Sequence, residues 1–356
     1  MDERYRKVLI KLDVPIREAL KQINEAALQV LIVVDDEDKI AGIVTDGDIR
    51  RGLINNISFD EPVRKIMNKK PITLKYPANE AEALELMKKY SIRHIPVINE
   101  KNEIVDIKLW SDFLNTGKAR YPDKNILVVI MAGGKGTRLD PFTKILPKPL
   151  IPIGDKTIIE RVMDNFKKYG FNRFIVTLKY KAEMIKTYFA ESSKDYQIEF
   201  IEEKEFLGTA GGLSLLKEKL TDTFILSNCD IVVDANFDSL LRYHKRNKNK
   251  ATILGVLQYV KVPYGVLGTQ GADLEEFVEK PEYHFIVNSG IYVMEPEVID
   301  LIPAGERIDM PELLKLVQGK NAKIQVFPQN CSWFDIGQWE EYNNAVEYIR
   351  RYWDSK

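Results

Sequence analysis

The stretch GGKGTRLDPFTKILPKPL, residues 133–150, places three glycines within its first four positions and follows them with two prominent cations. Because glycine has no Cβ, the backbone N–H groups of such a loop can approach an anion closely. Arg138 supplies a planar fork of donors, and Lys148 supplies a compact charge enclosed by two prolines. The stretch therefore predicts a loop that binds phosphate.

The two common phosphate motifs do not describe this loop. A dinucleotide fingerprint requires G-x-G-x-x-G at the start of a helix, and the third glycine and the helix are both missing here. A P-loop requires a lysine directly after its last glycine, whereas Lys135 precedes Gly136. The loop therefore indicates another class of phosphate site.

The segments around the loop alternate between strand and helix patterns. The apolar run ILVVIMA (126–132) directly before it is typical of a buried parallel strand. Further strands are expected at 174–178, 198–202 and 224–230, and helices at 157–169, 182–190, 210–219 and 236–247. Short strands follow, and the chain ends in a last expected helix at 338–351. This order predicts an α/β fold with a doubly wound, mostly parallel sheet.

An internal repeat precedes this region, because residues 19–49 match residues 83–113 without a gap at a constant offset of 64. Each copy reads as an amphipathic helix, a short apolar strand, a charged turn and a second strand. Two such units can bury a shared core that neither could bury alone. The sequence therefore predicts an α+β domain of two repeats at 1–118, a linker at 119–124 and the larger α/β domain at 125–356.

The first copy continues as GIVTDGDIRRGL (42–53), which resembles a cystathionine β-synthase (CBS) domain. Residues 1–118 thus resemble a tandem CBS pair. The resemblance implies that Thr45 meets the phosphate, and Asp48 the ribose hydroxyls, of a bound nucleotide or nucleotide sugar. Such a ligand would act as an effector of the larger domain.

The second copy keeps Asp112 but has Asp106 and Leu109 where the first has a glycine and a threonine. At most one nucleotide site therefore follows the family pattern. A threonine three residues before an aspartate at a helix start is also an ordinary N-cap arrangement, and CBS pairs often serve as dimerisation modules. Ligand binding and dimerisation both stay open, and we expect a homo-oligomer.

The loop also carries a longer pattern, G-x-G-x-R, then Pro-x-Thr, then Pro-Lys-Pro. It resembles the signature of the sugar-1-phosphate nucleotidylyltransferases, whose fold is Rossmann-like and GT-A-like. Further matching motifs are LGTAGGL (207–213), NCD (228–230), YGV (264–266), EKP (279–281), NSG (288–290) and WFDIG (333–337). The resemblance therefore covers the second domain from residue 125 to near residue 345.

The resemblance implies a role for each matching residue. Those implied to contact the nucleotide are Ala132, Gly133, Gly134, Gly136, Thr137, Arg138, Leu207, Gly208 and Thr209. Those implied to contact the sugar and its phosphate are Gly265, Glu279, Lys280 and Asn288. Asp230 and Asp335 are implied to bind Mg²⁺, and with Arg138 and Lys148 they make up the implied catalytic set.

The family reaction is attack of a sugar-1-phosphate oxygen on the α-phosphorus of a nucleoside triphosphate. The match is closest to mannose-1-phosphate guanylyltransferases, and the added CBS pair resembles the glucosamine-1-phosphate guanylyltransferases of legionaminic acid biosynthesis. The expected substrates are therefore GTP and glucosamine 1-phosphate. Mannose 1-phosphate as acceptor, and uridylyl, thymidylyl or cytidylyl transfer to another sugar 1-phosphate, stay open as alternatives. So does a nucleotide-sugar sensor without catalysis.

The composition of the 356 residues sets the remaining expectations. A net charge of −1 gives no bias towards nucleic acid or anionic membranes. No apolar stretch approaches the roughly 18 residues of a membrane span, and the N-terminus has no apolar signal-peptide core. We therefore expect a cytoplasmic protein without membrane or nucleic-acid partners. Cys229 and Cys331 are too few for a disulfide framework or a zinc site.

Overall fold

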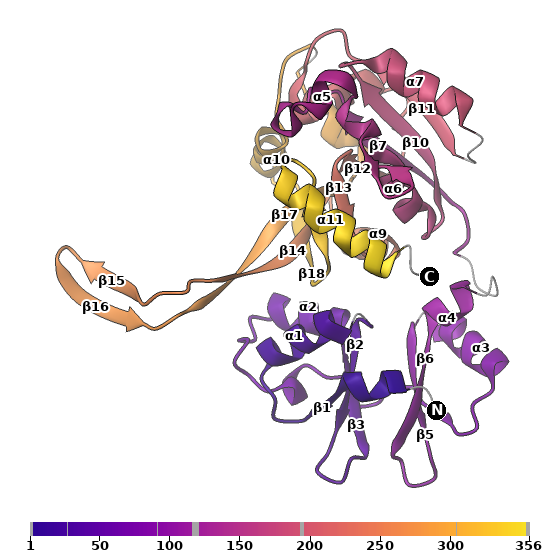
Figure 1. The fold of residues 1–356 in the computed structure, drawn as a ribbon, viewed down its shortest axis with the longest axis vertical. Helices are drawn as coiled ribbons and strands as arrows, with labels where there is room; N and C mark the ends of the chain where they lie inside the picture. Colours follow the sequence, from indigo (N-terminus) through magenta and orange to yellow (C-terminus); the bar gives the residue numbers. More distant parts are fainter. Residues whose placement is uncertain are drawn as a thin grey trace. The chain divides into compact units, whose positions relative to one another are not determined.

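The computed structural model describes residues 3–26, 28–90, 92–115, 121–192, 196–303 and 305–353. The chain divides into two compact units, Met1–Tyr121 and Pro122–Lys356 (Figure 1). Of the predicted linker at 119–124, the first two residues lie outside the described residues. Among the described residues, no helix is long and apolar enough to cross a membrane.

The first unit repeats one framework twice. The first copy contains η1 (Glu3–Val8), β1 (Leu9–Lys11), α1 (Ile16–Ala26), β2 (Val30–Val34), β3 (Ile40–Thr45), α2 (Asp46–Ile54) and η2 (Val63–Lys65). The second contains β4 (Leu74–Lys75), α3 (Glu80–Tyr90), β5 (His94–Ile98), β6 (Ile104–Leu109) and α4 (Trp110–Asn115). The bounds of α1, β2 and β3 recur 64 residues later in α3, β5 and β6, which confirms the repeat.

The repeat extends to individual contacts. The order of strands is β1-β2-β3 in one sheet and β4-β5-β6 in the other, each with a parallel pair followed by an antiparallel pair. Lys11 Nζ donates to the backbone oxygen of Asp35, at 2.6 Å, and to the Asp38 carboxylate, at 2.8 Å. Lys75 Nζ makes the equivalent pair of contacts one repeat later, to Asn99 and Asn102. In both sheets, therefore, a lysine at the end of the first strand binds the turn that connects the other two strands.

Asp48 caps the start of α2. Its Oδ2 accepts from the Thr45 backbone N–H at 2.8 Å and from the Thr45 hydroxyl at 2.6 Å, while Oδ1 pairs with Arg51. In the second copy, Asp112 accepts from the Leu109 backbone N–H at 3.2 Å. The contacts of both aspartates are thus those expected of an N-cap arrangement, and a nucleotide site here stays a prediction.

The second unit is built on a seven-stranded sheet in the order β11-β10-β7-β12-β17-β14-β18. The strands are β7 (Lys124–Ala132), β10 (Phe171–Leu178), β11 (Gln197–Glu202), β12 (Phe224–Asn228), β14 (Ala251–Lys261), β17 (Glu282–Met294) and β18 (Ile324–Gln329). All neighbouring pairs are parallel except the two that involve β17. The predicted mostly parallel sheet is therefore confirmed.

Helices cover both faces of this sheet. They are α5 (Phe142–Ile145), α6 (Ile158–Lys167), α7 (Ala182–Glu191), α8 (Gly208–Gly211), α9 (Phe237–Asn247), α10 (Met310–Gly319) and α11 (Trp339–Tyr352), with short η3 (Thr137–Leu139), η4 (Lys148–Leu150), η5 (Gly212–Leu216) and η6 (Pro296–Leu301). Val128 and Ile130 of β7 pack in one core with α6 and α9, whereas Val129 packs in another core with η5 and α10. Successive side chains of this buried strand therefore point into cores on opposite faces of the sheet, as the predicted doubly wound fold requires.

The helix predicted at 210–219 is wrong in its bounds. The structure has the four-residue α8 followed by the 3-10 helix η5, which ends at Leu216. Gly211 and Gly212 stand at the junction, and glycine is the poorest helix former after proline. A Cβ at Gly211 would also lie 2.9 Å from the backbone oxygen of Glu306. The close packing therefore requires glycine at a position where glycine weakens the helix.

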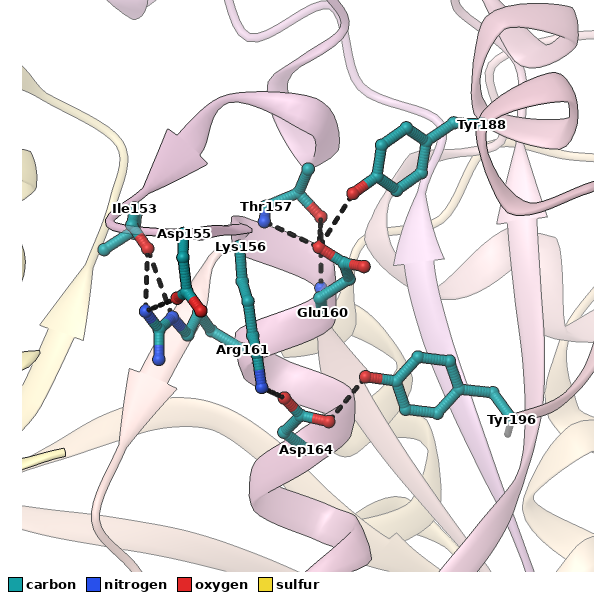
Figure 2. A network of polar contacts seen from close by, with 9 residues as sticks. All are labelled: Ile153, Asp155, Lys156, Thr157, Glu160, Arg161, Asp164, Tyr188 and Tyr196. Atoms are coloured by element: carbon teal, nitrogen blue, oxygen red, sulfur yellow. Dashed lines mark hydrogen bonds and ion pairs between the residues drawn. The ribbon is translucent and has the colours of Figure 1, made fainter. Parts of the chain in front are cut away.

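A buried polar network fixes the start of α6, directly after the lysine–proline segment of the loop (Figure 2). The Glu160 carboxylate is fully buried and accepts from the Thr157 backbone N–H at 2.8 Å and from the Tyr188 hydroxyl at 2.9 Å. Arg161 donates to the backbone oxygen of Ile153 at 3.0 Å. These contacts hold the short strands β8 (Pro152–Ile153) and β9 (Lys156–Thr157), and so they position the chain that leads out of η4.

Candidate active site

Two aspartates are brought together by a short antiparallel pair of strands. Asp230 lies between β12 and β13 (Ile231–Val233), and Asp335 ends β19 (Trp333–Asp335). Ile231 stands opposite Asp335 in this pair. The Ile336 backbone N–H also donates to the Asp230 backbone oxygen at 3.0 Å. The site therefore lies at the carboxyl end of β12, where open α/β sheets bind their ligands.

Lys148 lies against this pair. It begins η4, its side chain is buried, and its Nζ forms an ion pair with the Asp230 carboxylate. Gly136 has φ of +67°, and a Cβ there would lie 2.9 Å from the Lys148 Cβ. The glycine loop thus packs directly on the lysine stem, and only glycine fits at this position.

Arg138 completes the group from the loop side. A Cβ at Gly337 would lie 3.1 Å from an Arg138 guanidinium nitrogen and 3.2 Å from an Asp335 carboxylate oxygen. Burial and the charge of Asp230 raise the pKa of Asp335, whereas Lys148 and Arg138 oppose that shift. The four residues of the predicted catalytic set are therefore close enough to influence each other electrostatically.

This donor set suits a divalent cation that also binds substrate. Asp230 and Asp335 supply two carboxylates, and the described residues contain no group of three or more His, Cys, Asp and Glu side chains that could hold a metal. Mg²⁺ binds through one or two carboxylates together with substrate phosphates and water. The geometry therefore fits Mg²⁺ held jointly by protein and triphosphate.

The glycine loop leaves one position open. Gly133 faces the buried Glu203, whereas a Cβ at Gly134 would meet no atom within 4 Å. Ala132 ends β7, and Thr137 begins η3. The chain itself therefore does not require glycine at position 134.

Replacing Gly134 with alanine is expected to raise the KM for the triphosphate about 10- to 100-fold while leaving stability nearly unchanged. The methyl group would displace phosphate oxygens from charge-assisted backbone hydrogen bonds. Steady-state kinetics and a urea unfolding curve measure the two effects separately. An unchanged KM would show that the triphosphate does not approach this backbone.

The segment 207–209 is clamped to a distant turn. Gly208 has φ of +84°, and a Cβ there would lie 2.6 Å from the Ile308 backbone oxygen. The Ile308 N–H donates to the Leu207 oxygen at 3.0 Å, and the Thr209 N–H donates to the Asp309 carboxylate at 2.9 Å. These contacts give the predicted nucleotide-contacting segment a rigid backbone.

Glu203 was missed by the sequence analysis. It follows β11, is 5% exposed, and lies between the glycine loop and η5, because Cβ atoms at Gly133 and Gly212 would lie 3.4 Å and 2.7 Å from its Oε1. The Leu207 N–H approaches Oε2 at 3.4 Å. Burial raises the pKa of this carboxyl. The local sequence EEKE reads as a charged turn, and only the end of a buried strand would have indicated a site.

Among the residues predicted to bind the sugar phosphate, Asn288 lies apart from Gly265, Glu279 and Lys280. Asn288 lies on β17 opposite Gly255, and its amide donates to the Tyr292 hydroxyl at 2.6 Å. Glu279 and Lys280 lie beyond the far end of β17, past the pair that joins Lys261 to Glu282. From Asn288 the strand runs six residue steps to its end at Glu282, about 20 Å at about 3.3 Å per residue, and Lys280 lies two residues beyond that end.

Gly265 shares the remote position of Glu279. A Cβ at Gly265 would lie 3.1 Å from a Glu279 carboxylate oxygen. Both belong to an arm that leaves the sheet and ends in β15 (Val266–Gln270) and β16 (Asp273–Val278), as Figure 1 shows. Within the described residues, the sugar-side motif is thus intact locally but distant from Asn288.

Two family models match the chain. The model described as nucleotidyl transferase matches residues 127–351, and the model described as CBS domain matches residues 6–55 and 63–107. The first accounts for the sheet and the aspartate pair, and the second for the two repeats. The N-terminal unit is therefore a pair of CBS domains.

Curated relatives share the larger unit. The chain is 34% identical over 229 residues to the mannose-1-phosphate guanylyltransferase catalytic subunit beta of Xenopus tropicalis, covering 60% of this chain and 62% of that protein. It is 31% identical over 242 residues to the UTP–glucose-1-phosphate uridylyltransferase of Synechocystis, covering 62% of each. The chain thus spans about three fifths of the length of the curated relatives it matches.

A solved structure shares the fold of the same part. The crystal structure of HddC from Yersinia pseudotuberculosis superposes with a TM-score of 0.51 at 28% identity, covering 63% of this chain and 99% of that one. HddC has also been solved in complex with GMP-PN, with the same score and coverage.

Proposed function

The chain belongs to the nucleotidyl transferase family, and on that premise we propose that it transfers GMP from GTP to a sugar 1-phosphate, with glucosamine 1-phosphate the favoured acceptor. The products are a GDP-sugar and pyrophosphate. The observation that carries this proposal is the group formed by Arg138, Lys148 and the two aspartates. It concentrates charge without offering a nucleophile.

The chemistry asks for this arrangement. The sugar phosphate oxygen already carries negative charge, so no general base or covalent residue is needed, and the barrier comes from repulsion between two polyanions. Mg²⁺ held by Asp230 and Asp335 would offset part of that charge when bound. Lys148, Arg138 and, at the sugar phosphate, Lys280 would offset the rest. Cys229 is no competing nucleophile, because burial raises the pKa of its thiol to about 12.

The buried Glu203 supports guanine as the base. Guanine presents adjacent N–H donors on its Watson–Crick edge, which match the two oxygens of an ionised carboxylate, whereas uracil and thymine place carbonyl oxygens beside a single N–H. Glu203 lies between the glycine loop and the segment 207–212, where the resemblance puts the base. The curated relatives include both a guanylyltransferase and a uridylyltransferase, so the fold alone does not determine the base.

Replacing Glu203 with glutamine is expected to lower kcat/KM for GTP about 100-fold and to change kcat/KM for UTP less than about threefold. Only the ionised carboxylate accepts both guanine donors. Burial raises the pKa of Glu203, so as the pH falls this carboxylate is protonated earlier than an exposed glutamate would be. The KM for GTP should rise with that protonation, and the variant should lack this dependence. Steady-state kinetics across pH measures both effects.

The matched control is Glu205→Gln. Glu205 lies two residues on, with an 89% exposed side chain. It should leave both substrates unaffected. Equal losses for GTP and UTP in the Glu203 variant would instead assign this residue a structural role.

A panel of reactions tests the whole proposal. The protein and Mg²⁺ are incubated with each of GTP, UTP, dTTP and CTP against glucosamine, mannose, glucose and N-acetylglucosamine 1-phosphates, and pyrophosphate is followed. Turnover confined to GTP with glucosamine 1-phosphate is expected. Turnover with mannose 1-phosphate or with another base would replace only the specificity, whereas silence in every combination would favour the noncatalytic sensor.

The CBS pair would act as the regulatory part of this enzyme. Thr45 and Asp48 would then line a site for a nucleotide or nucleotide sugar, at the cost of the capping contacts they now make. Calorimetric titration of the full chain with AMP, ATP, GTP and the GDP-sugar, repeated with Asp48→Asn, tests this. Heats that are unchanged in the variant would exclude this site.

A further inference from the structure

The arm of the second unit exposes an apolar face that the rest of the described chain does not cover. Leu267 and Phe277 stand opposite each other in the β15–β16 pair, and Leu274 stands opposite Thr269 on the same face. These three side chains are 58%, 61% and 62% exposed. A two-stranded ribbon is at best marginally stable alone in water, and an exposed apolar patch usually marks an interface.

The same arm carries Glu279 and Lys280, two charged residues that lie away from the candidate active site of their own chain. Glu279 and Lys280 follow β16 directly, and the ribbon formed by β14 and β17 pairs without interruption from Val256 and Val287 to its end at Lys261 and Glu282. This regular pairing holds Lys280 away from Asn288, Lys148 and the glycine loop of its own chain. Any catalytic site assembled from one chain is therefore short of one cation and one carboxylate.

A complementary apolar patch lies beside the glycine loop. Phe142 and Ile145 of α5, which follows the loop directly, are 49% and 72% exposed. The glycine loop and α5 carry the exposed lysines Lys135 and Lys144, and the tip of the arm carries the exposed acidic residues Asp273, Glu275 and Glu276. The arm of one chain and the loop region of another thus each expose apolar side chains, and their charges are opposite in sign.

We propose that the arm exchanges between two copies of this chain, so that Glu279 and Lys280 of each copy complete the sugar-phosphate site of the other. The contact is self-complementary, because each copy gives an arm and receives one, as a twofold axis requires. The apolar face of the arm rests on α5 of the second copy. The inference rests on the proposed function, since it assigns Lys280 to a sugar phosphate.

The first test is complementation between two variants. Lys280→Ala lacks the cation of the arm, and Arg138→Ala lacks the cation of the loop. Each should be nearly inactive alone. When both are expressed together with different tags, the doubly tagged species should regain about half of the wild-type activity, because one of its two sites receives an intact loop and an intact arm. A doubly tagged species as inactive as its parents, or no such species, would overturn the exchange.

The second test does not depend on catalysis. A benzophenone amino acid replaces Leu267 in the full chain, and light is expected to join it to residues 142–145 of a second copy, giving a product of twice the mass. Crosslinking to residues 142–145 within one chain would mean that the arm folds back over its own site and would overturn the proposal. The same probe at Leu316, which is 43% exposed on α10, is the control and should give no such product.

These readouts separate the two ideas. If the wild-type protein transfers no nucleotidyl group but the crosslink forms between copies, the proposed function fails and the exchange of arms stands. If the wild type is active and the mixed species is not, the function stands and the exchange fails.

Discussion

Replacing Lys148 with methionine is expected to lower kcat/KM for nucleotidyl transfer about a thousandfold. Lys148 is buried, and its Nζ contacts Asp230, where the proposed function puts the reacting phosphates. The variant keeps the volume of the side chain but removes a charge that stabilises the transition state, an effect of about 100- to 1,000-fold for one well-placed group. It also leaves the carboxylates of Asp230 and Asp335 without their nearest cation, which destabilises the folded protein.

The matched control is Lys135→Met in the same loop. Lys135 is exposed, and no contact ties it to the aspartates among the described residues. It should lose less than about tenfold, as expected for a screened surface charge. Kinetics at saturating Mg²⁺, with circular dichroism to confirm folding, measures the difference. Similar losses in both variants would mean that the loop needs only positive charge and not a buried lysine at this point.

Replacing Gly208 with alanine is expected to destabilise the second unit by about 3 kcal/mol and to abolish measurable triphosphate binding. Two costs combine here. The left-handed conformation at φ of +84° costs a residue with a Cβ about 1–2 kcal/mol. The new methyl group would also lie 2.6 Å from the Ile308 backbone oxygen, which cannot move without opening the clamp at 207–209.

Gly271→Ala separates these costs. Gly271 also has a left-handed φ, of +66°, but a Cβ there meets nothing within 4 Å. It should therefore lose only the conformational cost, about 1–2 kcal/mol, and keep its affinity for the triphosphate. Urea unfolding and calorimetric titration of both variants provide the comparison. Equal destabilisation by the two substitutions would contradict the steric argument.

The sequence was a good guide where local pattern and packing agree. The strand at 126–132 and the helix at 236–247 are recovered within two residues, because their apolar periods coincide with the faces they bury. The aspartate pair was also within reach, since Asp230 follows a buried strand. Those predictions depend on features that the chain expresses over a few consecutive residues.

Two features of the site were beyond such patterns. Glu203 lies in a run of charges, and it is buried against Gly212 and against Gly133, which is remote in sequence. The separation of Lys280 from Asn288 has the opposite origin. The two residues are eight positions apart in sequence, yet extended pairing of residues 282–288 places them at opposite ends of a ribbon. Spacing along the chain indicates distance only when the secondary structure between the residues is known.

The repeat of the first unit has a practical consequence. Its two halves share the bounds of one helix and two strands, the order of the sheet and the lysine-to-turn contacts, so positions in these elements have structural counterparts 64 residues apart. Asp48 and Asp112 begin equivalent helices in one folded molecule, at the same pH and concentration. The protein thus contains its own internal reference, because a response seen at one aspartate but not at the other does not come from the solution conditions that the two share.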